Sequence, residues 1–253
     1  MRLIFFALFL SLASVAQPAP LPKLNGDAEA TTRIEKMLAR MGGREKWAKT
    51  RTYYIVYQQY HSGRRMGVGE ERSWRDVSVP GERLELWRTD YEGHTPRWGH
   101  AFNKRSGWIR QPEWLRDYSS QELADNLKFW KRDVYTMFHR MAAGDAALSY
   151  RFTAPNRIDV TEGGENIGWW EIDRGGTFLR WGVDNFNPYN PGSLSYIYGP
   201  YKKFGDISFP AWGASSDGLY RFEYLEFLVS PNALPDAVFD NPAAEPPAEL
   251  KLR

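Results

Sequence analysis

The sequence of 253 residues contains no cysteine. A disulfide is therefore excluded, and the fold must take its stability from a packed core even in an oxidising compartment. The absence of cysteine also excludes an acylated N-terminal cysteine, so we expect a chain that is not itself lipid-anchored.

Histidine is scarce, and His61, His94, His100 and His139 stand singly, without the paired spacing of a motif such as H-E-x-x-H. We interpret them as solvated or locally hydrogen-bonded imidazoles and expect no metal and no cofactor. No G-x-S-x-G motif occurs, so the sequence offers no nucleophile elbow. The oxygen-bearing side chains between positions 184 and 190 lack EF-hand spacing and are interpreted as turn formers.

Charge of one sign is also lacking, since 33 Lys and Arg stand against 31 Asp and Glu. No basic stripe is separated from its acidic neighbours, which excludes nucleic acid as an expected partner.

The first residues have the pattern of a bacterial secretory signal peptide. Arg2 precedes an apolar run over 3–12, and small residues lead to an expected cleavage near Ala16. The run is too short for a permanent membrane anchor. We therefore divide the chain into a signal peptide at 1–16, a flexible Pro-rich lead-in at 17–26, one folded domain at 27–242 and a disordered tail at 243–253, and we expect a soluble periplasmic protein.

Helical spacing of apolar residues predicts a helix over 27–41, capped by Asp27 and ended by Gly42-Gly43, and a short helical turn over 44–49. A capping box at Ser119 and Glu122 opens the longest predicted helix, 120–141. Its apolar stripe is either a core face lying on a sheet or a lid over an apolar cavity, and the two are compatible.

Most of the remaining chain has the period of strands. The connections are short, which favours antiparallel neighbours, and the last third predicts a long hairpin of 206–212 with 219–229 across a turn at 213–218. Strands before helices and again after them favour an α+β fold. The other predicted strands are 52–60, 66–77, 83–89, 97–102, 107–110, 147–153, 157–162, 167–173, 177–183 and 193–198.

Three segments together resemble one family. IEKMLARMGGREKWAKTRTYYIVYQQ near the start, and YKKFGDISFPAW and EYLEFLVSPNALPDAVFDNP near the end, are similar to the LolA/LolB-like superfamily, and more closely to its outer-membrane lipoprotein-sorting relatives. The resemblance implies a strongly curved antiparallel sheet, an unclosed half-barrel, with helices covering a concave face that holds acyl chains or other lipids.

Aromatic residues make up 15% of the chain, with eleven tryptophans. They fill a core, line a lipid cavity or form stacking platforms for sugars, in that order of preference. Trp169 and Trp170 are adjacent in a predicted strand, so one of the two must leave the concave side. Glu70, Glu71 and Asp76 alternate with arginines, which we interpret as a solvated charged face of a strand.

Our first hypothesis is a monomeric, non-catalytic carrier of a lipid, an acyl chain or a lipoprotein-type hydrophobic ligand, with an envelope membrane protein as its expected partner. Strand parity and the helical stripe select the following cavity residues: Leu84, Leu86, Trp98, Phe102 and Phe222 from the sheet, and Leu127, Trp130 and Val134 from the helix.

The second hypothesis is an envelope module that binds a protein or glycan through an outward aromatic patch. A hydrolase using Glu70 or Glu71 is the third.

Overall fold

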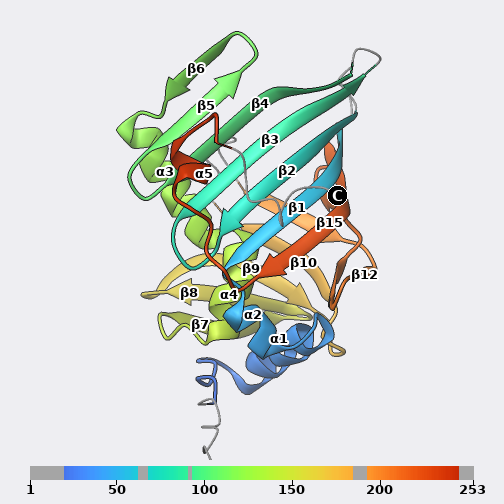
Figure 1. Ribbon diagram of the computed structural model, residues 1–253. Helices are drawn as coiled ribbons and strands as arrows, with labels where there is room; N and C mark the ends of the chain where they lie inside the picture. The colour runs from blue at the N-terminus through green and yellow to red at the C-terminus, as the bar shows by residue number, and fades with distance from the viewer. Residues whose placement is uncertain (1–19, 62–67, 91–92, 185–192, 245–253) are drawn as a thin grey trace, which may run out of the picture.

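The computed structural model describes residues 20–61, 68–90, 93–184 and 193–244 (Figure 1). Side chains are described for these residues except 61, 68, 88–90 and 93–97. The predicted signal peptide at 1–16 lies outside them, as do residues 245–253 of the predicted tail.

Thirteen of the described strands form one antiparallel sheet in the order β6-β5-β4-β3-β2-β1-β15-β14-β11-β10-β9-β8-β7. The sheet is not closed, since its edges are β6 and β7, and it bends around the helices (Figure 1). This confirms the predicted α+β half-barrel. The strands are β1 (Thr52–His61), β2 (Val68–Asp76), β3 (Gly81–Asp90), β4 (Gly93–Asn103), β5 (Gly107–Gln111), β6 (Trp114–Asp117), β7 (Leu148–Ala154), β8 (Arg157–Glu162), β9 (Glu165–Ile172), β10 (Phe178–Val183), β11 (Leu194–Tyr198), β14 (Trp212–Ser215) and β15 (Tyr220–Ser230).

The predicted terminal hairpin is right for β15 but wrong for its partner. β15 pairs with β14 and β1, whereas β13 (Ile207–Pro210) pairs with β12 (Tyr201–Phe204) in a separate two-stranded sheet. Pro210 has no N–H to donate to a ladder, and the run 206–212 is divided there between two partners.

Strands β3 and β4 are longer than predicted. The connection expected between the predicted strands 83–89 and 97–102 lies partly outside the described residues, and β4 already begins at Gly93. Pro96 is accommodated because it pairs with Trp87 next to a register shift, where the ladder is interrupted.

The long predicted helix 120–141 is two helices, α3 (Ser120–Arg132) and α4 (Val134–Ala143). Asp133 between them has an extended backbone (φ −60°, ψ 145°), and its carboxylate accepts a 2.9 Å hydrogen bond from the N–H of Tyr135. Asp133 is thus the N-cap of α4. The apolar stripe runs through this junction, which is why periodicity did not reveal it. The predicted capping box of Ser119 and Glu122 is confirmed at the start of α3.

The first two helices, α1 (Ala28–Arg40) and α2 (Arg44–Lys49), are where the sequence predicts them. Asp27 occupies the N-cap position of α1 but does not cap it with its side chain. The Asp27 carboxylate instead accepts a 2.9 Å hydrogen bond from the N–H of Phe152, which ties the helix start to β7. Gly26 just before it forms a bridge with Tyr150.

The main core lies between the inner face of the sheet and the helices. Trp47 of α2, with its ring centroid 5.6 Å from Phe138 of α4 and 5.9 Å from Tyr53 of β1, is at its centre. Trp170 is 1% exposed in this core, while Trp169 lies on the opposite face of β9 with the Arg157 guanidinium 4.7 Å above its ring. The predicted split of this tryptophan pair is therefore confirmed.

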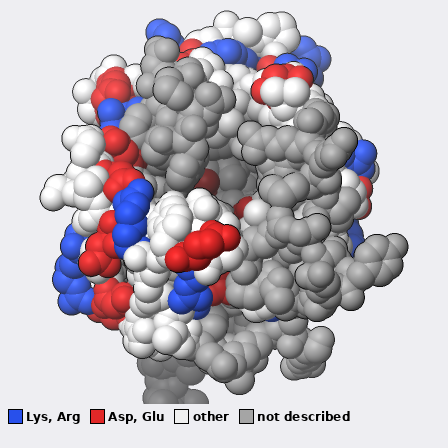
Figure 2. All heavy atoms as spheres, turned by 90° about the horizontal axis from the view of Figure 1, so that it is seen from above, with Lys and Arg blue, Asp and Glu red and all other residues white. Residues whose placement is uncertain are grey.

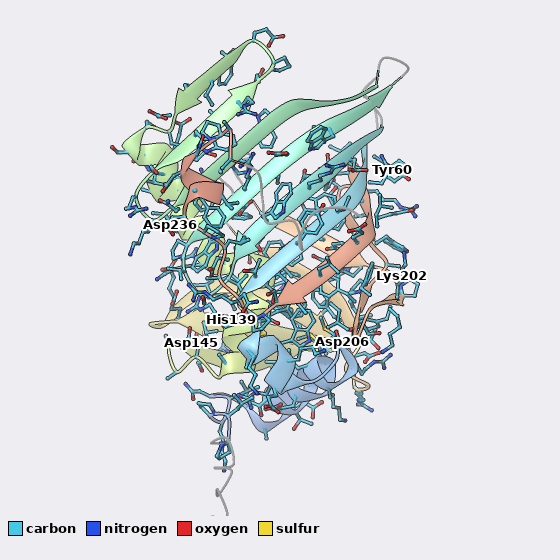
Figure 3. All side chains as sticks on the ribbon, viewed as in Figure 1. Tyr60, His139, Asp145, Lys202, Asp206 and Asp236 are labelled. Carbon is cyan, nitrogen blue, oxygen red and sulfur yellow. The ribbon has the colours of Figure 1, made fainter. Side chains whose placement is uncertain are left out.

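A smaller core covers the outer face of the sheet. Short helix α5 (Ala237–Asp240) lies against β3, β4 and β5, and Asp236 at its start is labelled in Figure 3. Trp108 Nε1 donates a 2.8 Å hydrogen bond to the carbonyl of Phe239, and the C-terminal segment buries Tyr54 and Trp74 of the sheet. Beyond α5, Arg83 donates a 2.7 Å hydrogen bond to the carbonyl of Ala244.

Candidate ligand-binding cavity

A cavity of about 700 Å³ lies between the inner face of the sheet and the junction of α3 and α4. Viewed from above, the molecule is hollowed near its centre, with acidic atoms visible inside the hollow (Figure 2). Strands β1, β2, β3, β4, β10, β11, β14 and β15 contribute to the lining, as does the connection from β14 to β15. The curvature of the sheet creates a volume that its strands alone do not fill.

Five of the eight residues selected from the sequence line this cavity: Leu84, Leu86, Trp98, Val134 and Phe222. Whether they bind a ligand stays a prediction.

The other three, Phe102, Leu127 and Trp130, are not among the described residues that line it. Phe102 shares the inner face of β4 but lies beyond His100, with the two ring centroids 6.2 Å apart. Trp130 is buried in the core, where its Nε1 donates a 3.0 Å hydrogen bond to the carbonyl of Asp76. For Trp130 the core interpretation therefore describes the packing, whereas Leu127 is half-buried.

Aromatic rings form much of the cavity wall. Trp181 and Tyr196, from neighbouring strands β10 and β11, are stacked with an interplanar angle of 6° and centroids 6.0 Å apart. Tyr135 at the start of α4 shares a 2.7 Å hydrogen bond between its hydroxyl and that of Tyr224. The aromatic residues of the lining are Tyr57, Trp98, Phe129, Tyr135, Trp181, Tyr196, Tyr198, Tyr220 and Phe222.

A buried ion-pair cluster meets the cavity between β2, β3 and the helix junction. Arg75 Nη2 lies 2.9 Å from Glu82 Oε2, and Arg75 Nη1 contacts the carboxylate of Asp133. The Arg75 guanidinium also lies 5.0 Å above the ring of Tyr135. The N-cap of α4 thus serves twice, as a helix cap and as an anchor for Arg75.

The expectation of a solvated charged strand is wrong for Glu71, Arg75 and Asp76, all of which are buried. Because strand residues alternate, Glu71 and Arg75 of β2 face inward onto the cavity, and Glu70 faces outward, where it pairs with Arg72 at 2.7 Å. Glu70 and Glu71 thus lie on opposite faces and do not act on one substrate as a pair. Asp76, at the strand end, pairs with Arg51 at 3.1 Å.

Burial shifts the ionisation of this cluster. Desolvation raises the pKa of Glu82 and of Asp133, and the positive charge of Arg75 opposes both shifts. The pKa of Arg75 is raised, because Asp133 and Glu82 outweigh the opposing effect of burial.

The hydrogen bonding of Glu71 in the cavity wall is incomplete. Its Oε2 accepts a hydrogen bond from Gln59 Nε2, whereas its Oε1 has no hydrogen-bond partner in the described part of the chain. Desolvation raises the pKa of Glu71 well above its ordinary value, the nearby charge of Glu82 raises it further, and Arg75 opposes the shift. The carboxyl of Glu71 is therefore protonated far more readily than a solvated one.

His100 is locally hydrogen-bonded, one of the two states expected for the histidines. Its Nδ1 shares a 2.6 Å hydrogen bond with the hydroxyl of Tyr118, and its Nε2 lies 3.7 Å from Glu82 Oε1. Burial, aided by Arg75, lowers the pKa of His100 to about 3, so the ring is neutral. His139 on α4, labelled in Figure 3, has its Nδ1 3.3 Å from the carbonyl of Trp47.

The side chains of His61 and His94 lie outside those described. Across the described ranges, no group of three or more His, Asp or Glu side chains is arranged to hold a metal ion.

The search of protein-family models found no match, and the search of curated proteins found none either. Among solved structures, the chain is similar to the crystal structure of a LolA superfamily protein from Nitrosomonas europaea, with 9% sequence identity and a TM-score of 0.47. The match covers 85% of this chain and 99% of that one. No function and no site residue is carried over from this likeness.

Proposed function

We propose that this protein is an exported, non-catalytic binding protein that carries a hydrophobic ligand, such as a lipid or an acyl chain, in the cavity between the sheet and the α3–α4 junction. The observation that supports it is a cavity of about 700 Å³ walled mainly by aromatic and aliphatic side chains. This volume is in the range of small-molecule sites, and each Å² of apolar ligand surface removed from water contributes about 25 cal/mol.

Two groups at the cavity, Arg75 and His100, support binding rather than chemistry. Arg75 is engaged by Glu82 and Asp133, and His100 is held neutral beside Tyr118. Groups fixed in this way orient a bound molecule and do not exchange protons readily near neutral pH.

Export is part of the proposal and rests on the pattern of residues 1–16. None of the helices formed by residues 20–61, 68–90, 93–184 and 193–244 combines the length and the apolar character needed to cross a membrane. Within the proposal the carrier is a monomer, an envelope membrane protein is its partner, and the acyl chain of a lipoprotein is one cargo of suitable chemistry.

The second hypothesis, an outward aromatic patch for a protein or glycan, has less support. Trp47 and Trp170 lie in the inner core and Trp98 and Trp181 line the cavity, while Tyr54 and Trp74 on the outer face are covered by the C-terminal segment of the same chain. Trp114 at the β6 edge is 41% exposed, a single ring rather than a patch.

Uptake of a fluorescent apolar probe tests the proposal. N-phenyl-1-naphthylamine is expected to brighten on addition to delipidated wild-type protein. Leu86→Arg places a charge on the cavity wall and is expected to abolish the signal, while Leu228→Arg makes the same change on the outward, exposed side of β15 and is expected to retain it. Equal signals from the two variants, each shown to be folded by circular dichroism, overturn the proposal.

A further inference from the structure

The described lining of the cavity has an excess of acidic groups for a site with apolar walls. Its described lining contains the carboxyl groups of Glu71, Glu82, Asp133 and Asp217, one guanidinium, that of Arg75, and the imidazole of His100, which burial keeps neutral. The charge of Arg75 is already balanced by Glu82 and Asp133, although its Nε has no hydrogen-bond partner in the described part of the chain. A negatively charged head group entering here meets repulsion, and a positively charged one meets attraction.

Among the acidic residues of the lining, Glu71 has a buried carboxyl oxygen that is open to a ligand. Only 6% of the residue is exposed, it lies on the cavity wall, and its Oε1 has no hydrogen-bond partner in the described structure. Buried carboxyl oxygens are nearly always hydrogen-bonded, and an unsatisfied one costs free energy that a suitable donor recovers. A donor that enters the cavity can therefore complete the hydrogen bonding of Glu71.

The surroundings of Glu71 favour a cationic donor over a neutral one. Tyr57 is its direct cross-strand neighbour on β1, and Tyr196 and Tyr220 lie close enough to interact electrostatically with its carboxylate. The faces of aromatic rings attract ammonium groups through the ring quadrupole, and this attraction strengthens when the cation leaves water.

We propose that the cavity binds an amphiphile whose head is a primary ammonium group, donating an N–H hydrogen bond to Glu71 Oε1 while its apolar tail lies along Leu84, Leu86 and Trp98. This inference rests on the proposed function and adds the head-group class to it. A primary ammonium fits better than a quaternary one because only the primary group has N–H donors.

Binding is coupled to proton release. In the empty cavity Glu71 takes up a proton readily; on binding, its O–H bond breaks, the proton passes to water, and the carboxylate pairs with the ammonium. The charged and titratable groups that face Glu71 are Tyr57 of β1, Arg75 of β2, Glu82 of β3, Tyr196 of β11 and Tyr220 of β15. The released proton comes from Glu71 alone, and none of these other groups changes its protonation state.

Titration calorimetry with three probes of equal chain length tests the inference: decylammonium, decanol and decanoate, each below its micellar concentration. The wild-type protein is expected to bind decylammonium at least about tenfold more tightly than decanol, as a charge-assisted hydrogen bond predicts, and decanoate most weakly. Heats measured in two buffers of different ionisation enthalpy are expected to show a proton released with decylammonium only.

Glu71→Gln is expected to reduce the preference for decylammonium over decanol to near unity without changing the affinity for decanol. Glu226→Gln, on the outward side of β15, is the matched control and is expected to keep the preference. Equal binding of decylammonium and decanol by the wild-type protein overturns the head-group inference while leaving the carrier proposal intact. Binding of none of the three probes overturns both.

Discussion

Arg75 and Glu82 face each other across β2 and β3 and form a 2.9 Å ion pair with less than a tenth of either side chain exposed. Asp133 completes the cluster from the helix junction. Removing one partner of such a pair leaves an uncompensated buried charge, which is more costly than the net contribution of the pair itself. The cluster therefore fixes where the α3–α4 junction meets the sheet, and with it one wall of the cavity.

Asp133→Ala is expected to lower the free energy of unfolding by about 3–5 kcal/mol for the broken buried pair, and by about 1 kcal/mol more for the lost helix cap. Asp133→Asn keeps an oxygen that accepts from the Tyr135 N–H but removes the charge, so it is expected to lose less. Urea denaturation of both variants measures the difference. Equal losses in the two variants would show that the cap contributes nothing.

Acid is expected to destabilise the protein through His100. The pKa of its folded state, about 3, lies below the ordinary 6.5, so the unfolded chain binds a proton that the folded chain does not, and stability is lost as pH falls below 6.5. Between pH 6.5 and 4 the loss from this group reaches about 3 kcal/mol.

His100→Gln, which does not titrate, is expected to lose less stability than the wild type over the same pH interval. Thermal unfolding at several pH values, with His139→Gln as a second histidine variant, checks this. The expectation fails if His100→Gln and the wild type have parallel pH profiles.

Glu71 is expected to lower the stability of the protein as pH rises, which is opposite to the pH dependence caused by His100. The pKa of its folded state is raised, so its contribution to stability is fully present below its ordinary value of 4.5 and is lost as pH rises through the folded pKa. Glu71→Gln has no such loss, so without ligand it is expected to unfold at a higher temperature than the wild type at pH 8, with the gap narrowing at pH 4. A variant less stable than the wild type at pH 8 contradicts this.

The outer core predicts a structural role for the C-terminal segment. Phe239 is 4% exposed, and a Cβ added at Gly81 would lie 2.9 Å from its ring. Phe239→Ala is expected to cost about 3–5 kcal/mol, and Gly81→Ala is expected to destabilise by forcing the ring away. Denaturant unfolding measures both, and a loss below about 1 kcal/mol for Phe239→Ala would show that α5 does not stabilise the sheet.

The period of apolar residues was sufficient to predict most of the strands and the two N-terminal helices, because burial on one face leaves a direct trace in a sequence. It could not show the break at Asp133, since the stripe continues across it. It also gave 206–212 the wrong partner, because the pairing of strands depends on the tertiary fold.

The cavity was predictable in part for the same reason. Alternation placed Leu84, Leu86, Trp98 and Phe222 on the inner face, where the structure has them at the cavity. Alternating Glu and Arg along β2 have the pattern of a solvated strand, and only the curvature of the sheet and the α3–α4 junction bury Glu71 and Arg75. The burial of a charge depends on what packs over it, which local sequence does not contain.

The most direct test of the central claim is native mass spectrometry, followed by organic extraction, on mature protein purified from a periplasmic fraction without detergent. The proposal predicts one co-purifying hydrophobic molecule per chain, absent from Leu86→Arg and retained by Leu228→Arg. A clean mass of the bare chain that neither added lipid nor detergent shifts would contradict it.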